Sequence, residues 1–534
     1  MVEFIKSRWV LIVVSVLFVL FKIPHLLLPF YWDESWPYVP AVREMYRNGI
    51  SLLPGAVNPD LSRGHPLFFH SIYATWMHIF GSSNKALHSF ALFISLGFLV
   101  TIFEVGYRLF NQRVAIISLL LVATHVSFFV QSSFVLPEIM VGFLAFLSIY
   151  LYVKEQFLFA TLSLTALFFT KESGLIAGIV IGSDAIISFF NKGIDLKKRI
   201  LRLLPVTISC LAIASFFIWQ KHIRGWYFLP LYSNSILFKW DAIWSRFGTG
   251  VIHAIFCQDY EGIIFVTMAV YSILLIKKAR PSAIFVPFSI SILIIIGYYT
   301  ETSRIIELWG KGPIIFAYTY FIFFAFIFFY LFVLFYFSKK QFYTSDTQRR
   351  FIILTGFFIL CLILFSSDVY FISRYVLAAG IAVLFLAAVF FDILIRHSHK
   401  ALYYLLIAII LFTAYLSFKG SKGWGDEQMG FTKALKTQLA VVEFMERSNF
   451  YDRHICTNSY LELIHLTDPD CGFLSSKKNF KYVGYDIDQF TELLIYDNVE
   501  NNDAIPGAMT NNPDFQLIYK IDYGDKWAEI YKRK

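Results

Sequence analysis

Apolar stretches of bilayer length alternate with short polar segments along most of the chain. About thirteen such runs occur, and they cover residues 9–30, 86–105, 114–131, 137–153, 157–170, 173–190, 203–219, 260–276, 282–299, 313–337, 351–366, 371–395 and 401–418. A helix needs about 20 apolar residues to cross a bilayer, so most of these runs predict transmembrane helices. The run at 157–170 is shorter and predicts a thin or half-buried helix.

The charged connections between the runs indicate an orientation. Lys6 and Arg8 precede the first run, and every second connection carries Lys or Arg: "YRLFNQR", "KEQ", "NKGIDLKKRILR", "KKARP", "SKKQFYTSDTQRR" and "RHSHK". Because short cytoplasmic loops are rich in Lys and Arg, these segments are predicted to lie on the cytoplasmic side of the cytoplasmic (inner) membrane. The longer loops 31–85, 220–259 and 300–312 are then outside. An odd number of spans places the chain after Lys419 outside as well.

The pattern changes near Gly420. Residues 421–450 have the spacing of a helix, and short β-rich runs follow: "HICTN", "ELLIYDN", "FQLIYKID" and "WAEIYK". We therefore predict two domains. Residues 1–419 form a transmembrane catalytic domain with a large first outer loop at 31–85, and residues 420–534 form an extracytoplasmic α/β domain. No internal repeat is visible, which weighs against an inverted-repeat transporter.

Composition agrees with a polytopic α-helical membrane protein. Hydrophobic residues make up 57% of the chain and charged residues 16%, and the mean hydropathy is +0.62. Soluble domains are about 25% charged, so a soluble enzyme is excluded. The net charge of +9 follows from the inner loops and does not indicate nucleic-acid binding. Of five cysteines, only Cys456 and Cys471 are a plausible disulfide pair, and whether they pair is open.

Ionisable residues gather at the predicted outer ends of the spans. The stretch "FYWDESWPYVP" places two adjacent carboxylates directly after the first span. An ionisable side chain in the membrane costs about 2.5–3.5 kcal/mol on insertion scales, so each one is a functional hypothesis by default. The outer set comprises Asp33, Glu34, Arg63, His65, Glu138, Lys171 and Arg374. A carboxylate that accepts a proton from a hydroxyl, with cations around a phosphate, suits transfer from a phosphate-linked donor.

Simpler explanations exist for several members of this set. Asp33 or Glu34 would also serve as a helix cap, and Glu138 as a first-turn residue favoured by the helix dipole. Lys171 would also pair with Glu172 or with a lipid headgroup. The aromatic residues around Asp33 would stack on a sugar ring or simply belong to the aromatic belt of the membrane interface.

The order of these features resembles a known family. A long first outer loop that opens with Asp-Glu is similar to the GT-C glycosyltransferases, and most to the protein O-mannosyltransferase and lipid A aminoarabinose transferase group (glycosyltransferase family 39-like). The supporting stretches are "GHPLFFHSIYATWMHIFG", "QSSFVLPEIMVGFLAFLSIYLY", "LFFTKESGL" and "ISRYVLAAGIAVLF". The resemblance covers residues 1–190 well, 365–395 loosely and the C-terminal domain hardly. It departs from the group at Gly64-His65-Pro66, where a Pro-Pro pair is usual, and at Glu138, where Asp is usual.

The resemblance implies a GT-C fold and a sugar donor carried on a polyprenyl phosphate, with transfer outside the membrane and inversion at the anomeric carbon. Asp33 is then the general base, and Glu34 orients it or binds sugar hydroxyls. Glu138 holds the acceptor or the sugar. The candidate ligands of the donor phosphate are Arg63, His65, Lys171 and Arg374. The resembled group works without a cofactor, although two carboxylates from separate loops leave a divalent metal open.

The partners expected from this interpretation are the lipid-linked donor, membrane lipids and a glycan, lipid or protein acceptor. Two other functions remain open. A flippase or transporter of lipid-linked sugars would use the same outer cations, but it predicts charges near the middle of the spans. An O-antigen polymerase or ligase would use a late outer loop such as 300–312, and it leaves Asp33 and Glu34 unexplained.

Overall fold

The computed structural model describes most of the chain. The described residues are 2–230, 243, 251, 345–368, 372–396, 400–421, 423, 425–500, 504–507 and 512–534. The predicted spans at 260–276, 282–299 and 313–337, the loop at 300–312 and most of the loop at 220–259 lie outside them. The chain divides into two compact units. The first comprises Met1–Phe18, Ile94–Phe128 and Pro137–Ser417, and the second Val19–Phe93, Phe129–Leu136 and Phe418–Lys534.

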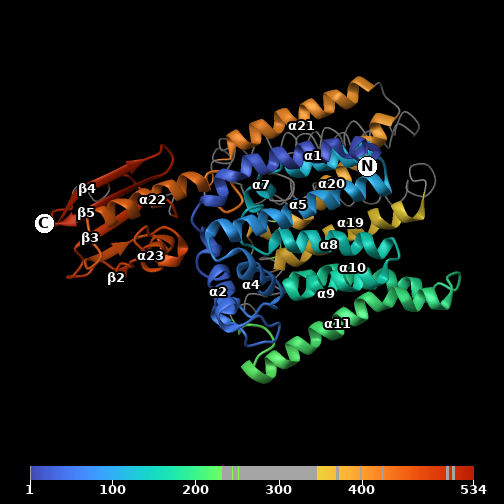
Figure 1. Ribbon diagram of the computed structural model, residues 1–534, viewed down its shortest axis with the longest axis horizontal. Helices are drawn as coiled ribbons and strands as arrows, with labels where there is room; N and C mark the ends of the chain where they lie inside the picture. The colour runs from blue at the N-terminus through green and yellow to red at the C-terminus, as the bar shows by residue number, and fades with distance from the viewer. Residues whose placement is uncertain are drawn as a thin grey trace, which may run out of the picture. The chain divides into compact units, whose positions relative to one another are not determined.

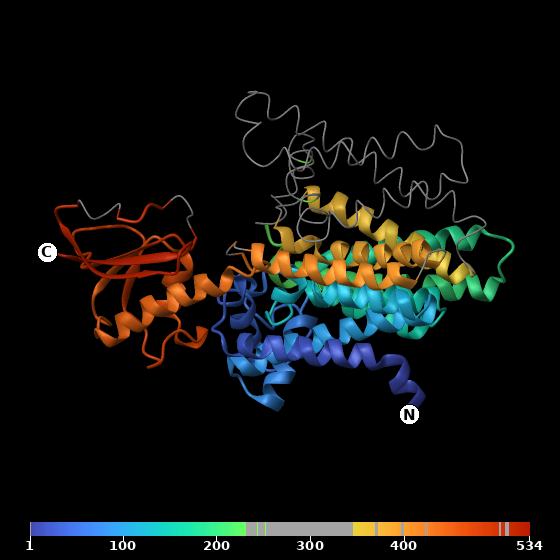
Figure 2. The same ribbon diagram turned by 90° about the horizontal axis from the view of Figure 1, so that it is seen from above.

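The first unit is built from helices, most of which are labelled in Figure 1. They are α1 (Val2–Lys22), α5 (Asn84–Leu109), α6 (Gln112–Ala123), α7 (Val126–Gln131), α8 (Glu138–Val153), α9 (Phe157–Thr170), η3 (Glu172–Gly174), α10 (Leu175–Phe190), α11 (Leu196–Arg224), α19 (Asp346–Asp368), η5 (Ser373–Val376), α20 (Leu377–Arg396) and α21 (Lys400–Gly420), of which α1, α5, α7 and α21 continue into the second unit. Within the bundle, α8 packs on α9 and α20, α9 packs on α11, and α10 packs on α11 and α19 (Figures 1 and 2).

Long apolar helices make this a polytopic membrane fold. Among the described residues, six helices are long and apolar enough to cross a membrane: Arg8–Leu27, Asn84–Leu109, Glu172–Phe190, Leu196–Arg224, Asp346–Ser367 and Tyr403–Gly420. Large apolar side chains on their outer faces are exposed, among them Phe21 at 67% and Phe412 at 63%. Exposed apolar faces of this kind suit contact with lipid. The predicted fold class, a polytopic helical membrane protein with a C-terminal α/β domain, is confirmed.

Two predicted runs differ from the helices observed. The run at 114–131 is divided, because α6 ends at Ala123 and α7 begins at Val126. The hydroxyl of Thr124 donates to the Leu120 carbonyl oxygen, and Nδ1 of His125 accepts the Phe128 N–H, so side chains replace helical partners at the break. In the first run the α-helix ends at Lys22, because Pro24 cannot continue it. A 3₁₀ turn, η1 (Ile23–Leu27), follows.

The first outer loop folds as a small helical layer in the second unit. It contains η2 (Trp32–Glu34), α2 (Tyr38–Asn48), α3 (Pro59–Ser62) and α4 (Phe68–Phe80). The interface helix predicted after Pro66 is α4, and it packs on α2. The rings of Tyr38 and Phe69 meet edge to face at 5.7 Å, and both are buried. The loop therefore has its own core beside the Asp33-Glu34 pair.

The C-terminal segment forms a sheet with helices in the second unit. Its elements are α22 (Phe431–Arg447), β1 (His454–Thr457), α23 (Tyr460–Thr467), η6 (Pro469–Cys471), β2 (Tyr482–Gly484), β3 (Leu493–Asp497), β4 (Phe515–Asp522) and β5 (Trp527–Arg533). The sheet order is β2-β1-β3-β5-β4, with β1 parallel to β2 and β3, and β5 antiparallel to β3 and β4. The four predicted strands are confirmed, whereas the short edge strand β2 was missed. The helix predicted from residue 421 begins only at Phe431, after Gly423 and Gly425.

The C-terminal segment and the first outer loop share one compact unit. The Arg43 guanidinium donates to the Asp470 carbonyl oxygen at 2.8 Å, and the Phe30 N–H donates to the Cys471 carbonyl oxygen at 3.0 Å. At Gly472, where φ is +89°, a Cβ would lie 2.2 Å from Nδ2 of Asn84. Backbone and side-chain hydrogen bonds therefore join the loop to residues 470–472 within this unit, and the predicted domains 1–419 and 420–534 stay a prediction.

The two candidate cysteines of this unit are separate free thiols. The Cys456 thiol lies 3.2 Å from the Tyr485 carbonyl oxygen, and the Cys471 thiol lies 3.5 Å from the Ser35 carbonyl oxygen. Both side chains are buried. Each thiol is thus used as a small buried group and not in a disulfide.

Candidate active site

The motif after the first span is a tight 3₁₀ turn, η2. Trp32 has a left-handed backbone, with φ of +55°, which is uncommon for a bulky residue. Hydrogen bonds hold this conformation: the Tyr31 N–H donates to Oε2 of Glu34 at 3.1 Å, and the Ser35 hydroxyl donates to the Trp32 carbonyl oxygen at 2.6 Å. The turn sends the adjacent side chains of Asp33 and Glu34 into different surroundings. Backbone strain of this kind is concentrated at functional sites.

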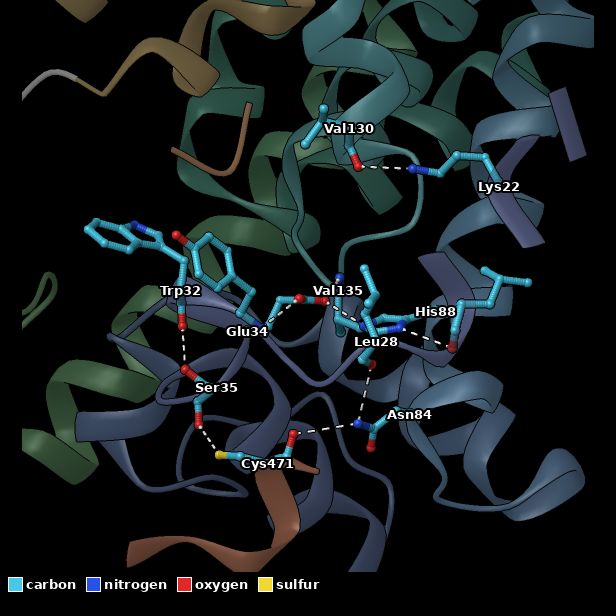
Figure 3. A network of polar contacts seen from close by, with 12 residues as sticks. Lys22, Leu28, Trp32, Glu34, Ser35, Asn84, His88, Val130, Val135 and Cys471 are labelled. Carbon is cyan, nitrogen blue, oxygen red and sulfur yellow. Dashed lines mark hydrogen bonds and ion pairs between the residues drawn. The ribbon is translucent and has the colours of Figure 1, made fainter. Parts of the chain in front are cut away.

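Glu34 is a fully buried anchor of the second unit. Its Oε1 accepts the Val135 N–H at 2.6 Å and lies 3.2 Å from Nε2 of His88 (Figure 3). Its exposed fraction is 0%. Both oxygens are therefore occupied by protein groups, which favours a positioning role for Glu34 and gives no support to the expected binding of sugar hydroxyls.

A buried lysine holds the other end of the segment that Glu34 contacts. Nζ of Lys22 donates to the Phe129 carbonyl oxygen at 2.7 Å. It also lies 3.4 Å from the Val130 carbonyl oxygen (Figure 3). Residues 129–136 are thus fixed by Lys22 at one end and by Glu34 at the other. Along the chain, this segment leads directly into α8. Lys22 was not among the predicted site residues, although a lone lysine at the end of an otherwise apolar span is a visible signal.

Asp33 differs from Glu34 because it remains partly exposed. The indole Nε1–H of Trp36 donates to its Oδ1 at 3.1 Å. The Arg63 guanidinium carbon lies 4.0 Å from the centre of the Trp36 ring, a cation–π contact. Arg63 also has a left-handed backbone, with φ of +56°. The structure therefore brings Asp33 and Arg63 together through Trp36, and Asp33 is oriented while it stays accessible.

His65 lies two residues beyond Arg63 in the same turn. The backbone N–H of His65 donates to the Ser62 carbonyl oxygen at 3.0 Å, and the His65 side chain is partly exposed. The turn itself starts at Asn58, whose side chain caps α3 by accepting the Asp60 N–H. This local capping explains why the segment before Pro66 folds back within the loop.

Three predicted site residues meet in the first unit. Nζ of Lys171 lies 2.8 Å from Oε1 of Glu138, and Nε of Arg374 lies 3.7 Å from the same oxygen. The side chains are 12%, 5% and 1% exposed for Lys171, Glu138 and Arg374. We call these three residues the Glu138 cluster. It joins the start of α8, the end of α9 and the turn before α20. Lys171 therefore pairs with Glu138 across helices.

The Glu138 cluster has the charge balance of an anion site. One carboxylate and two cations sum to +1, and both cations face the ring of Tyr375, Lys171 Nζ at 4.4 Å and the Arg374 guanidinium carbon at 5.7 Å. Oε2 of Glu138 is buried without a hydrogen-bond partner among the described residues. A buried cluster with excess positive charge can stabilise a phosphate.

The opposite ends of the same helices carry the basic residues of the predicted inner loops. Glu155, after α8, contacts Lys198 at 2.8 Å and Arg202 at 2.9 Å, both at the start of α11. Arg350, at the start of α19, contacts Asp184 at 2.6 Å. Loops predicted to share one side of the membrane therefore meet at one end of the bundle. The Glu138 cluster lies at the other ends of α8 and α9.

Metal ligands are not grouped in the described part of the chain. No three His, Cys, Asp or Glu side chains lie together there in a way that could hold a metal ion. The Trp36 indole donates to Oδ1 of Asp33, and Lys171 and Arg374 lie within 4 Å of Oε1 of Glu138.

Buried carboxylates form a second group at the carboxyl ends of β1 and β3. Asp497 is 1% exposed, and its Oδ1 accepts the Val499 N–H at 2.8 Å. Burial raises the pKa of Asp497 to about 7, and nearby Glu500 adds to the rise. Burial, together with Asp497 and Glu500, also raises the pKa of Glu462 well above its ordinary value. This group could not be predicted from the spacing of residues along the chain, because it depends on the pairing of β1 with β3.

A comparison of this chain with solved structures finds proteins with a similar fold. No family model and no curated protein matches the chain. ArnT from Cupriavidus metallidurans, a GT-C lipid A aminoarabinose transferase, matches in two states. Bound to undecaprenyl phosphate it has a TM-score of 0.48 at 12% identity, over 99% of this chain and 98% of that chain. In the apo state it has a TM-score of 0.48 at 11% identity, over 96% of this chain and 97% of that chain.

A third solved structure that matches is the archaeal oligosaccharyltransferase AglB from Archaeoglobus fulgidus, in complex with an inhibitory peptide and a dolichol-phosphate. It has a TM-score of 0.43 at 12% identity, over 92% of this chain and 70% of that chain. The functional proposal below rests on the residues of this chain.

Proposed function

We propose that this protein is a membrane glycosyltransferase. It moves a sugar from a polyprenyl-phosphate-linked donor to an acceptor hydroxyl outside the cytoplasmic membrane, with inversion at the anomeric carbon. The observation that carries the proposal is the contrast between two adjacent carboxylates: Glu34 is buried and fully hydrogen-bonded, whereas Asp33 is partly exposed and oriented by Trp36.

Asp33 is the general base of this reaction. A base must reach the proton of the attacking hydroxyl, and it must be held in a fixed orientation. The indole of Trp36 occupies Oδ1 of Asp33, and the neighbouring turn is fixed through Glu34. The Asp33 carboxylate accepts the proton as the acceptor oxygen attacks the anomeric carbon. The bond between that carbon and the phosphate oxygen breaks in the same step.

Lys171 and Arg374 bind the donor phosphate. As the sugar leaves, negative charge grows on the lipid phosphate, and two buried cations beside it lower the energy of that state. Glu138 holds both cations in place through its Oε1. Arg63 and His65 remain candidates for the phosphate or the acceptor, and Glu138 remains a candidate for contact with the sugar. The protein would act in the inner membrane with its C-terminal domain outside.

The alternative is a flippase of lipid-linked sugars, and one assay separates the two. The purified protein is reconstituted into vesicles that contain polyprenyl-phosphate sugars labelled in the sugar. A transferase releases free polyprenyl phosphate and moves the label to an acceptor. A flippase moves the intact lipid between leaflets and releases none. Release of polyprenyl phosphate that depends on acceptor supports the proposal, and movement without release contradicts it.

A further inference from the structure

A line of aromatic rings leads from Asp33 into the C-terminal domain. Trp36 donates to Asp33, and its ring meets the ring of Tyr460 edge to face, with centroids 5.7 Å apart. Tyr460 in turn stacks with Tyr485, at 6.3 Å and an interplanar angle of 14°. We call Trp36, Tyr460 and Tyr485 the aromatic track. It joins residues that are more than 400 positions apart in the sequence.

The two tyrosines keep their rings exposed while their backbones are fixed. Tyr460 is 43% exposed and Tyr485 is 47% exposed. The Glu500 carboxylate accepts the Tyr460 N–H at 3.0 Å, and the Cys456 thiol donates to the Tyr485 carbonyl oxygen at 3.2 Å. Exposed aromatic rings on a rigid backbone provide contact area at a low cost in conformational entropy. Such rings, each with a polar tip, are suited to contact with a ligand that is part apolar and part polar.

We propose that the aromatic track is the acceptor subsite and that the acceptor is a carbohydrate. This inference rests on the proposed function, because Asp33 must receive the acceptor hydroxyl. A sugar ring has an apolar C–H face and a hydroxyl edge. Its C–H face fits the negative face of an aromatic ring, and its hydroxyls fit the phenol groups of Tyr460 and Tyr485.

A charged group beside the rings favours a sugar over a lipid chain. The Arg63 guanidinium lies over the Trp36 ring at 4.0 Å, and the carboxylate of Glu500 lies at the start of α23, where Tyr460 begins the helix. The Arg63 guanidinium can donate to sugar hydroxyls, which a lipid tail lacks, whereas the Glu500 carboxylate already accepts the Ser459 hydroxyl and the N–H groups of Tyr460 and Leu461. The C-terminal domain thereby selects the acceptor.

The test is a kinetic comparison of variants in the full-length protein. Tyr460→Ala, Tyr485→Ala and the double variant are assayed with labelled lipid-linked sugars extracted from membranes of a deletion strain. The acceptor probe is the envelope carbohydrate fraction of the same strain. We expect the double variant to raise the KM for this fraction at least tenfold, while kcat and the donor KM stay within twofold of wild type. Tyr523→Ala is the matched control, because Tyr523 is 41% exposed in the same domain and lies outside the track.

Treatment of the acceptor fraction with periodate or protease distinguishes a sugar acceptor from a protein acceptor. Periodate cleaves vicinal diols of sugars, and we expect it to abolish acceptance, whereas protease treatment should leave it intact. Loss of acceptance after protease alone, or an unchanged acceptor KM in the double variant, would overturn the carbohydrate subsite and leave the transferase intact. If the wild-type protein releases no polyprenyl phosphate with any fraction, the proposed function itself fails.

Discussion

Oε1 of Glu34 accepts the backbone N–H of Val135 across 2.6 Å, which fixes the motif after the first span to the segment that leads into α8. These two residues are about 100 positions apart, and both belong to the second compact unit. The bond explains why one of two adjacent carboxylates is structural. Lys22 completes the arrangement, because it holds the Phe129 carbonyl oxygen at the start of the same segment.

Glu34→Gln should lower both stability and turnover. A glutamine has one oxygen, so it cannot accept from both Tyr31 and Val135, and its NH₂ group would face a backbone N–H. A buried donor without a partner costs about 1–3 kcal/mol. Thermal unfolding of the purified protein in detergent measures this change. Glu44→Gln is the control, because Glu44 accepts a single backbone N–H, from Asn58 at 2.9 Å. Equal stability of the two variants would show that Glu34 is no anchor.

Lys171→Ala should weaken donor binding. It removes one of the two cations of the Glu138 cluster, and a lost charge-assisted hydrogen bond corresponds to about a tenfold rise in the donor KM. The matched control is Lys198→Ala, because Lys198 also lies 2.8 Å from a glutamate, Glu155, in the same unit. Steady-state kinetics with varied donor separates KM from kcat. A similar change in both variants would point to a general loss of structure instead.

A single sequence was enough to predict most of the fold. The long apolar runs located the helices of the described membrane segments. The short β-rich runs after residue 450 located four of the five strands. Three residues of the outer set, Glu138, Lys171 and Arg374, do lie together in the structure. Spacing along the chain could not show that Glu34 is buried, since its partners Val135 and His88 come from other segments. For the same reason the contact between Trp36 and Tyr460 had no sequence signal.

The C-terminal domain should be extracytoplasmic. The prediction rests on the alternation of basic loops, and the contacts of Glu155 with Lys198 and Arg202 support a common inner side for these loops. An alkaline phosphatase fusion at Lys534 reports this directly, since the enzyme is active only outside the cytoplasm. A fusion at Asn191, in the predicted inner loop after α10, is the inactive control. An inactive fusion at Lys534 together with an active one at Asn191 would reverse the topology.

Asp497 should make the stability of the C-terminal domain depend on pH. Its folded pKa of about 7 lies above its ordinary value, so the folded state binds more protons than the unfolded state between about pH 4 and pH 7. Stability contributed by the neutral acid is full below about pH 4 and is lost as the pH rises through about 7. Asp497→Asn cannot ionise, so it should stabilise β3 at pH 8 by about 1–3 kcal/mol and have little effect at pH 4.5.

Hydrogen exchange of the β3 amides in the full-length protein measures this difference, with variant and wild type compared at the same pH. Asp522→Asn is the control. Asp522 also accepts the N–H two residues ahead, that of Gly524, but it lies on the surface. An equal effect of Asp497→Asn at both pH values would contradict the raised pKa.

The identity of the general base is tested most directly by the transfer rate of Asp33→Asn. The Asn side chain can still accept the Trp36 indole hydrogen, so folding and donor binding should persist, while the basicity is lost. The measurement is transfer from a polyprenyl-phosphate sugar by purified protein in detergent, with Asp60→Asn, an exposed carboxylate of the same loop, as the control. We predict a loss of about 10²–10⁴-fold for Asp33→Asn and an unchanged rate for Asp60→Asn. A wild-type rate in Asp33→Asn would contradict the assignment of Asp33 as the base.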